Sequence, residues 1–210
     1  WFPPTPTFTP RPTQATTPTP QMLEPLGDLL LSDDFEQPET WELGSSERGN
    51  TAIGNQRLTV AVMQPRSLLF SLRKGPALED AYIEITASPN LCSGLDEYGL
   101  MFRVSSLGDF YRYSLSCNGQ VRLDRLAGAV ASSPQPWTVS GQAPPGAPGS
   151  VHLGVWIKGR EMRFFLNGEF QFSVNTPLLA GGVVGVFARA AGDKPVSVSF
   201  SELRIYSISP

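Results

Sequence analysis

Arginine and acidic side chains recur at alternate positions of three consecutive apolar segments between residues 98 and 126. Alternation places such residues on one face of a β-strand, so we expect them to share the face opposite the core. Arginine forks beside carboxylate and hydroxyl groups suit hydrogen bonding to sugar hydroxyls or to a ligand carboxylate. The candidate ligand-binding residues are Arg103, Arg112, Arg122 and Asp124. The alternative interpretation is a solvated sheet face, where the same alternation occurs without a ligand.

Trp137 is a further candidate for ligand binding. It lies within residues 132–149, a segment rich in Pro and Gly that is predicted to be a loop. An indole there could stack on a sugar ring; alternatively, it caps the core. Trp156, by contrast, shares a predicted face with His152 and lies opposite Arg163, so cation–π packing explains it without a ligand.

Candidate catalytic residues are scarce. His152 is the only histidine, and it alternates with Val151 and Leu153, so we expect it to point away from the core. No Ser/His/Asp or Cys/His set suited to nucleophilic catalysis surrounds it in the sequence. The formal net charge of −3, from 16 Lys and Arg against 19 Asp and Glu, gives no electrostatic reason to expect nucleic acid or an anionic membrane surface as a partner.

Two Asn-Gly pairs flanked by alternating apolar residues, Asn118-Gly119 and Asn167-Gly168, predict β-hairpins. A two-residue loop would put the apolar sets of the two strands on opposite faces, because a shift of one residue in register turns every side chain over. A three-residue loop with a bulged glycine puts both sets on one face. We therefore expect the loop 117–119 in the first hairpin and the pair Phe164–Phe170 in the second.

Short apolar segments separated by turn residues continue from Leu29 onward, with no convincing amphipathic helix. This pattern is typical of an all-β antiparallel sandwich or jelly roll. The predicted strands are Leu29–Phe35, Thr51–Ile53, Arg57–Met63, Ser67–Arg73, Ala81–Ala87, Tyr98–Val104, Phe110–Ser116, Gln120–Leu126, Val151–Lys158, Glu161–Leu166, Phe170–Val174, Val183–Ala188 and Val196–Tyr206.

Cys92 and Cys117 are predicted to form a disulfide. Cys117 lies in the first Asn-Gly loop, and Cys92 lies in the loop before the strand Tyr98–Val104. Because that strand should pair with Phe110–Ser116, both cysteines fall at the same end of the sheet. A bridge is favoured in an exported protein, and two buried free thiols are the alternative.

Several longer motifs occur in a fixed order. They are SDDF at Ser32–Phe35, Trp41, YGLMFRVSSLGDFYRYSL at Tyr98–Leu115, LGVWIKGREMRFFLNG at Leu153–Gly168, GGVVGVFA at Gly181–Ala188 and VSFSELRI at Val198–Ile205. Together, over residues 28–208, they resemble the concanavalin A-like lectin/glucanase superfamily, in particular the bacterial 3-keto-disaccharide hydrolase-like branch related to family-16 glycosidases. The resemblance implies a two-sheet jelly roll, exported and often tethered, with a concave sheet that meets glycans in relatives. Arg103 matches the arginine of the family's strand motif.

The resemblance also shows what is missing for hydrolysis. A family-16 glycosidase carries two glutamates and an aspartate clustered on one strand, as nucleophile, helper and acid. The acidic groups of this chain, Asp33/Asp34, Glu79/Asp80, Glu84 and Asp96/Glu97, do not have that spacing. We therefore assign no catalytic residue and expect no hydrolysis.

Calcium is the one cofactor that the resemblance raises. Many relatives bring an aspartate near the last strand to residues such as Asp33 and Asp34, whereas this chain has Ser201 and Glu202 there. Calcium prefers six to eight oxygen ligands, and the sequence does not assemble them. Surface carboxylates at a strand end are the preferred interpretation, so no metal ligand and no cofactor is assigned.

The chain is expected to comprise a Pro/Thr-rich linker or stalk, residues 1–27, and one jelly-roll domain, residues 28–210. Because it begins at Trp1, we expect an upstream signal or anchor segment and an extracellular or cell-surface location, with membrane contact only through that anchor. The leading functional hypothesis is a glycan-binding, lectin-like module without catalysis. The alternatives are a structural or protein-interaction subunit of a cell-surface assembly, and a glycoside hydrolase-like enzyme.

Overall fold

The computed structural model describes residues 22–177, 179 and 181–208. Apart from one short 3-10 turn at Pro38–Thr40, the regular elements of this part of the chain are β-strands. They are β1 (Leu26–Asp33), β2 (Gly44–Ser46), β3 (Gly49–Gly54), β4 (Arg57–Val62), β5 (Leu68–Leu72), β6 (Ala81–Leu91), β7 (Glu97–Ser106), β8 (Asp109–Ser116), β9 (Gln120–Ala127), β10 (Val130–Val139), β11 (Val151–Lys158), β12 (Glu161–Leu166), β13 (Glu169–Asn175), β14 (Val183–Arg189) and β15 (Val196–Ile208).

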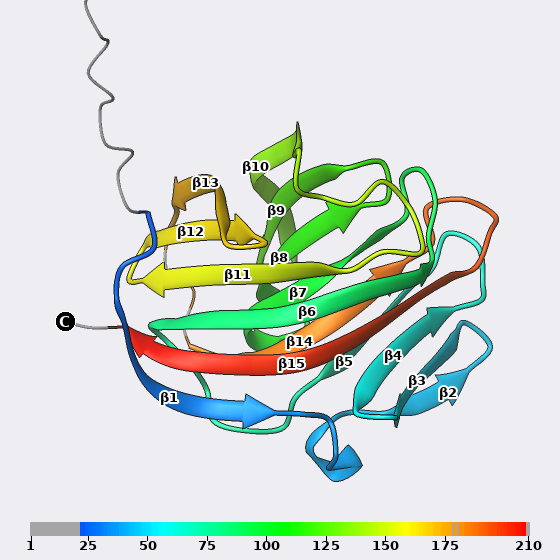
Figure 1. Cartoon of the computed structure of the whole chain (residues 1–210), viewed down its shortest axis with the longest axis horizontal. Coiled ribbons are helices and arrows are strands. Elements are labelled where there is room, and N and C mark those ends of the chain that lie inside the picture. Colours follow the sequence, from blue (N-terminus) through cyan, green and yellow to red (C-terminus); the bar gives the residue numbers. More distant parts are fainter. Residues whose placement is uncertain (1–21, 178, 180, 209–210) are drawn as a thin grey trace, which may run out of the picture.

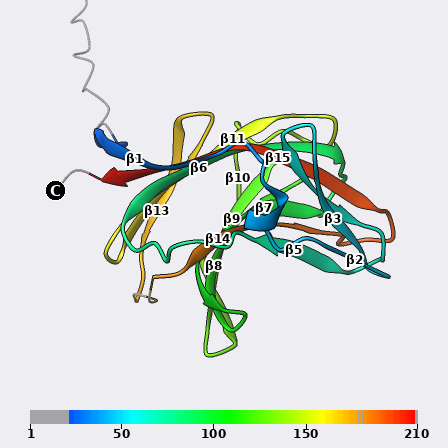
Figure 2. The same cartoon turned by 90° about the horizontal axis from the view of Figure 1, so that it is seen from below.

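The strands form two antiparallel sheets, so the predicted all-β sandwich is confirmed. The nine-stranded sheet has the order β13-β12-β11-β6-β15-β4-β3-β2, with β1 also paired to β15. The six-stranded sheet has the order β10-β9-β8-β7-β14-β5. Figure 1 shows β11, β6 and β15 lying side by side, and Figure 2 shows β5, β8 and β14 in the layer beneath them.

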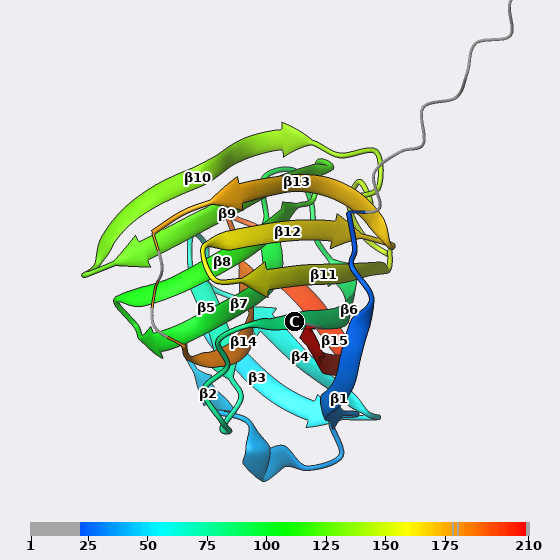
Figure 3. The same ribbon diagram turned by 90° about the vertical axis from the view of Figure 1, so that its left-hand side faces the viewer.

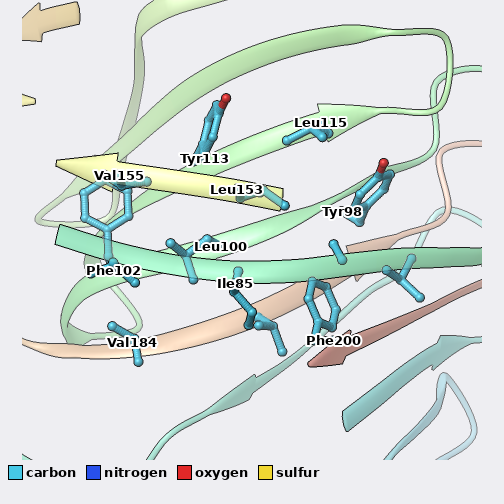
Figure 4. Packing of buried hydrophobic residues seen from close by; sticks show 14 of the residues in the cluster. Ile85, Tyr98, Leu100, Phe102, Tyr113, Leu115, Leu153, Val155, Val184 and Phe200 are labelled. Atoms are coloured by element: carbon cyan, nitrogen blue, oxygen red, sulfur yellow. The ribbon is translucent and has the colours of Figure 1, made fainter. Parts of the chain in front are cut away.

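The inner faces of the two sheets enclose one core. Ile85, Leu153 and Phe200 of the nine-stranded sheet meet Leu100, Phe102 and other side chains of the six-stranded sheet in Figure 4. Each of these positions alternates with an outward-facing neighbour, as half-buried strands require. The alternation therefore decides which residues remain on the two outer faces, where a ligand can reach them.

The first hairpin is confirmed in register. Ser116 pairs with Gln120 and Leu115 with Val121, which leaves residues 117–119 as the loop. Only Gly119 of this loop has a positive φ, 85°, as a bulged glycine requires. The apolar residues of both strands consequently share the core face.

The second hairpin differs from the prediction. Leu166 pairs with Glu169, so the loop has two residues, and both Asn167 and Gly168 have positive φ, 50° and 79°. Two left-handed residues define a type I′ turn. The extra residue bulges between the pairs formed by Phe165 and Phe164, so that Phe164 faces Phe172 rather than Phe170.

The segment 132–149, predicted to be a loop, contains part of β10. This strand pairs only with β9 and lies at the edge of the six-stranded sheet. Its Pro134 and Pro136 cannot donate backbone hydrogen bonds, which is tolerated at a sheet edge and explains why the sequence pattern concealed the strand. The three-residue strand β2 was also not predicted.

The disulfide between Cys92 and Cys117 is confirmed, with the two Cα atoms 5.8 Å apart. It joins the β6–β7 loop to the β8–β9 loop, across the strand pair β7–β8. The backbone N–H of Cys117 also donates to the carbonyl of Asp96 at 2.9 Å. This end of the six-stranded sheet is therefore held by both covalent and hydrogen bonds.

The Pro/Thr-rich stretch itself lies outside the described residues, but the chain is already packed from Met22 onward. Met22, Leu23 and Leu26 contact an outer-face cluster of Tyr82, Trp156 and Phe165. Figure 3 shows this segment passing the ends of β12 and β11. The guanidinium carbon of Arg163 lies 4.3 Å from the centre of the Trp156 ring, as expected, and Arg163 donates a hydrogen bond to the Met22 carbonyl at 2.9 Å.

Within the described ranges there is no helix with the length and apolarity to cross a membrane.

Candidate functional site

Three of the predicted ligand-binding residues meet on the outer face of the six-stranded sheet. Arg112 on β8 and Arg122 on β9 both approach Oδ2 of Asp124, with Nη2–Oδ2 distances of 2.7 and 2.8 Å. The register places Arg112 directly opposite Asp124. The other carboxylate oxygen of Asp124 accepts a hydrogen bond from the Ser133 hydroxyl at 2.7 Å. The alternation read from the sequence therefore brings these side chains into one cluster.

Trp137, Glu97 and Arg189 complete this cluster. The guanidinium carbon of Arg122 lies 4.4 Å from the centre of the Trp137 ring, within cation–π range. Arg122 also donates to Glu97 at 3.1 Å, and Arg189 donates to the other oxygen of Glu97. We call the six residues Glu97, Arg112, Arg122, Asp124, Trp137 and Arg189 the arginine face.

Glu97 and Arg189 were not predicted, although the signal was present. Glu97 lies two positions before Gly99 and four before Met101 on β7, and Arg189 lies two positions after Phe187 on β14. Extending the outward alternation to the ends of both strands identifies them.

The arginine face has a defined electrostatic character. It combines three guanidinium groups with two carboxylates, so its net charge is positive. The carboxylates are largely covered: Glu97 is 2% exposed and Asp124 6%. The Nε atoms of Arg112 and Arg122 are covered and have no hydrogen-bond partner among the described residues. A ligand could therefore meet these arginines only through their terminal nitrogens, and the Asp124 carboxylate already accepts three hydrogen bonds from the protein.

A group of apolar residues lies on the same outer face. Phe187 is fully buried beneath Arg112, whose guanidinium carbon lies 5.1 Å from the ring centre. It belongs to a second hydrophobic cluster, separate from the core, which we call the apolar strip. Its members are Leu68, Phe70, Leu72, Met101, Val104, Phe110, Leu126, Val183 and Phe187.

Arg103 does not belong to the arginine face, so that prediction is wrong. Its side chain is 2% exposed and reaches the carbonyls of Glu79 and Gly159 and the carboxylate of Asp80, at 3.1–3.2 Å. A register irregularity follows Phe102 in β7, and Arg103 has φ 48°. A bulge of this kind redirects the side chain. Burial lowers the pKa of Arg103, and its contacts join the two sheets at one end.

No carboxylate of the arginine face is placed for hydrolysis. Glu97 and Asp124 both accept from the same nitrogen of Arg122, and both are almost fully covered. A glycosidase needs two carboxyl groups that can reach the scissile bond from a cleft. The hollows that open between β2 and β5, between β10 and β13, beside Asp96 and beside Glu202 do not include Arg112 or Asp124.

His152 points outward from the nine-stranded sheet, as expected. Its Nε2 lies 3.5 Å from Oε2 of Glu84. The same glutamate is approached by the hydroxyl of Tyr206 at 3.4 Å and by Arg204 at 3.9 Å. Burial, reinforced by the Glu84 carboxylate, raises the pKa of Tyr82 well above its ordinary value. This group is a polar network on the sheet surface.

A second candidate site, which the sequence did not reveal, lies farther along the same outer face. It is a hollow of about 500 Å³ where the end of β1, the β3–β4 turn, β6 and β15 meet. We call it the polar hollow. The residues that matter for its chemistry are Asp34, Asn55, Arg57, Thr86, Glu202 and Arg204. They come from four separate parts of the sequence, so no local spacing of residues predicts the hollow.

The backbone around the polar hollow is specialised. Asn55 has φ 51° and Glu202 φ 57°, both in the left-handed region that few non-glycine residues adopt. The β6–β15 pairing is irregular between Ser201 and Arg204, and the carboxylate of Glu202 accepts from the Thr86 hydroxyl at 2.9 Å. The bulge thus turns Glu202 toward the hollow.

Asp33, considered above with calcium, is engaged by the protein itself. Its carboxylate accepts hydrogen bonds from Arg73 at 2.7 Å, from the Trp41 indole at 3.1 Å and from the Phe35 backbone at 2.9 Å. Among the described residues there is no group of three or more His, Cys, Asp or Glu side chains that could hold a metal ion. Asp33 therefore acts as a structural anchor between the start of the domain and β5.

Comparisons with known proteins place the fold. No protein-family model matches the sequence, and no curated protein matches it. Among solved structures, the carbohydrate-binding module CBM66 from Bacillus subtilis is similar, with a TM-score of 0.60, 14% identity, and coverage of 80% of this chain and 96% of that one. The catalytic domain of an endo-1,3-beta-glucanase (laminarinase) from Thermotoga petrophila has a TM-score of 0.61 and 10% identity, with 90% and 100% coverage.

A beta-glucanase from Bacillus licheniformis is similar too, with a TM-score of 0.61, 9% identity, and coverage of 87% of this chain and 99% of that one. These likenesses confirm the concanavalin A-like jelly-roll fold. The neighbours include both a binding module and hydrolases, and the fold alone does not separate the two functions.

Proposed function

We propose that this concanavalin A-like domain is an exported, non-catalytic carbohydrate-binding module that uses the arginine face. The observation that carries the proposal is the arrangement of Trp137 and Arg122, in which an indole only partly buried lies against a guanidinium that two carboxylates hold in place. Aromatic rings beside fixed polar groups are suited to sugars, which present both apolar C–H faces and hydroxyls.

The ligand chemistry follows from the charges. The arginines on this face outnumber the carboxylates, and their forks match the geometry of a carboxylate or sulfate group as well as of paired hydroxyls. An acidic or hydroxyl-rich glycan is therefore the proposed ligand. Because Asp124 and Glu97 fix the arginines before binding, little side-chain entropy is lost when a ligand arrives.

Two alternatives make different demands on the same surface. The glucanase neighbours favour a hydrolase, which would need accessible carboxylates in a cleft. The apolar strip favours a protein-interaction domain of a surface assembly, because five of its nine members are only partly buried and a partner could cover them. The disulfide is consistent with an oxidising, extracellular location, which an upstream signal or anchor segment would provide.

A glycan array tests the proposal with the purified chain and two variants. We expect binding to an acidic or hydroxyl-rich glycan, reduced about tenfold by Trp137→Ala, which removes roughly one stacking contact. Val139→Ala is the matched control, because Val139 is on the same strand and is 77% exposed. Absence of binding to any glycan would contradict the proposal, and so would release of reducing ends from a β-glucan by the intact chain.

A further inference from the structure

The polar hollow differs from the arginine face in having side chains without partners. In the described part of the chain, no hydrogen bond or ion pair engages the side chains of Asp34, Asn55 and Arg57. Glu202 uses one oxygen for Thr86. A carboxylate, an amide and a guanidinium thus line one concave surface with their hydrogen-bonding capacity unused.

The lining of this hollow carries no excess of positive charge. Asp34 and Glu202 accompany Arg57 and Arg204, Arg204 also lies 3.9 Å from Glu84, and the neighbouring Asp33 is neutralised by Arg73. An acidic ligand would therefore gain no net attraction here. The hollow therefore favours a neutral ligand, in contrast to the positively charged arginine face.

The donor and acceptor pattern indicates the class of that ligand. A sugar hydroxyl donates one hydrogen bond and accepts others, so vicinal hydroxyls match a lining that alternates carboxylates with amide and guanidinium groups. A volume of about 500 Å³ lies within the roughly 300–1,000 Å³ of small-molecule sites and suits a short sugar segment. No aromatic ring is among the residues that line it, so recognition would depend on hydrogen bonds rather than on stacking.

We propose that the polar hollow is a second binding site, specific for a neutral, hydroxyl-rich sugar unit, on the sheet opposite the arginine face. This proposal rests on the proposed carbohydrate-binding function, but it depends on no residue of the arginine face. Two sites on opposite outer faces would let one domain engage two glycan chains, or two parts of a branched one, with the gain in avidity that linked sites provide.

The test is a titration of the isotope-labelled chain, followed by the backbone amide signals in nuclear magnetic resonance. The probes are laminarihexaose and mannohexaose as neutral sugars and a hexameric oligogalacturonate as an acidic one. The hollow variant is Asp34→Ala with Asn55→Gly; glycine accepts the φ of 51° at position 55, so the backbone is not strained. Trp137→Ala serves as the matched variant of the other site.

We expect a neutral hexamer to shift the amides of Asn55, Thr86 and Glu202, and the hollow variant to weaken that binding at least tenfold while Trp137→Ala leaves it unchanged. Shifts confined to the arginine face would overturn the second site and leave the proposed function standing. Loss of all binding, to neutral and acidic probes alike, would overturn both. Shifts at the hollow produced by calcium chloride alone would assign it to a cation and overturn the sugar proposal.

Discussion

The arginine face and the polar hollow lie on opposite outer faces of one sandwich, and they arrange their charges in different ways. On the arginine face, both carboxylates are almost fully covered and each is held by two arginines. In the polar hollow, Asp34, Asn55 and Arg57 are exposed and engage no other described residue. In the first region the charged groups are paired with one another and packed against the rings of Phe187 and Trp137. In the second region the polar groups are open to solvent and to a ligand.

This difference separates two uses of polar residues. A buried, paired charge is costly to disturb, because removing one member leaves the others without a partner in a medium of low dielectric. An exposed, unpaired group contributes little to folding and is available for a ligand. The pairing and exposure of a side chain therefore predict how much its removal lowers the free energy of unfolding. Stability measurements can test that prediction independently of any ligand.

The largest effect is expected at Arg103, which the sequence had assigned to the ligand and the structure assigns to the fold. Arg103→Ala should lower the free energy of unfolding by about 3 kcal/mol, because the carbonyls of Glu79 and Gly159 lose their donor and a packed side chain is removed. Denaturation in urea measures it. Arg57→Ala is the matched control, since that guanidinium is exposed; equal effects of the two changes would break the comparison.

A smaller loss is expected at the centre of the arginine face. Asp124→Ala should cost about 2 kcal/mol, because Arg112, Arg122 and Ser133 all lose an acceptor and two like charges face each other. The arginines are partly exposed, so salt should reduce the loss. Thermal melting at low and high ionic strength provides the measurement. A loss that is the same in both would show that the pairing is not electrostatic.

Tyr113 sharpens the comparison, because its hydroxyl also lacks a partner but lies where no ligand can reach. It is fully buried, and no described residue bonds to it. Tyr113→Phe should raise stability by about 1 kcal/mol at pH 7, since an unsatisfied polar atom is removed.

The pH dependence of the same variant provides a second check. Burial holds the pKa of Tyr113 well above 10, whereas the unfolded chain ionises near 10. The stability contributed by keeping this phenol neutral is fully present below pH 10 and is lost as the pH rises further. The advantage of the phenylalanine variant should therefore grow in alkaline solution; a constant difference between pH 7 and pH 11 would contradict the assignment.

Sequence patterns predicted the elements better than the exceptions within them. The alternation on β8 and β9 placed Arg112, Arg122 and Asp124 correctly, because regular strands keep a period of two. Arg103 was misplaced because its own left-handed backbone conformation at a bulge redirects its side chain, and no feature of the local sequence predicts that bulge. The two Asn-Gly loops differ for a related reason: the apolar pattern requires one extra residue but does not say where it bulges.

The polar hollow could not be predicted for a different reason. Asp34, Asn55, Thr86 and Glu202 are far apart in sequence, and the pairing of β15 with β1, β4 and β6 brings them together. Asp34 and Asn55 look like ordinary polar residues at a strand end and a turn, and Thr86 and Glu202 look like ordinary polar residues within strands. The register of long-range strand pairs, rather than any motif, creates the hollow.

The smallest effect on the free energy of unfolding is expected in the polar hollow, and a small effect would show that its side chains are not needed for folding. Asp34→Ala and Arg57→Ala should each change the free energy of unfolding by less than about 0.5 kcal/mol, because neither side chain loses a partner. Urea denaturation of both single variants and of the double variant measures this, and the double should equal the sum of the singles if the groups do not interact. Either residue costing as much as Asp124 would mean that the hollow is a structural network like the arginine face. A coupling between the two above about 0.5 kcal/mol would mean that they pair with each other in solution, which would leave less of the lining free to receive a sugar.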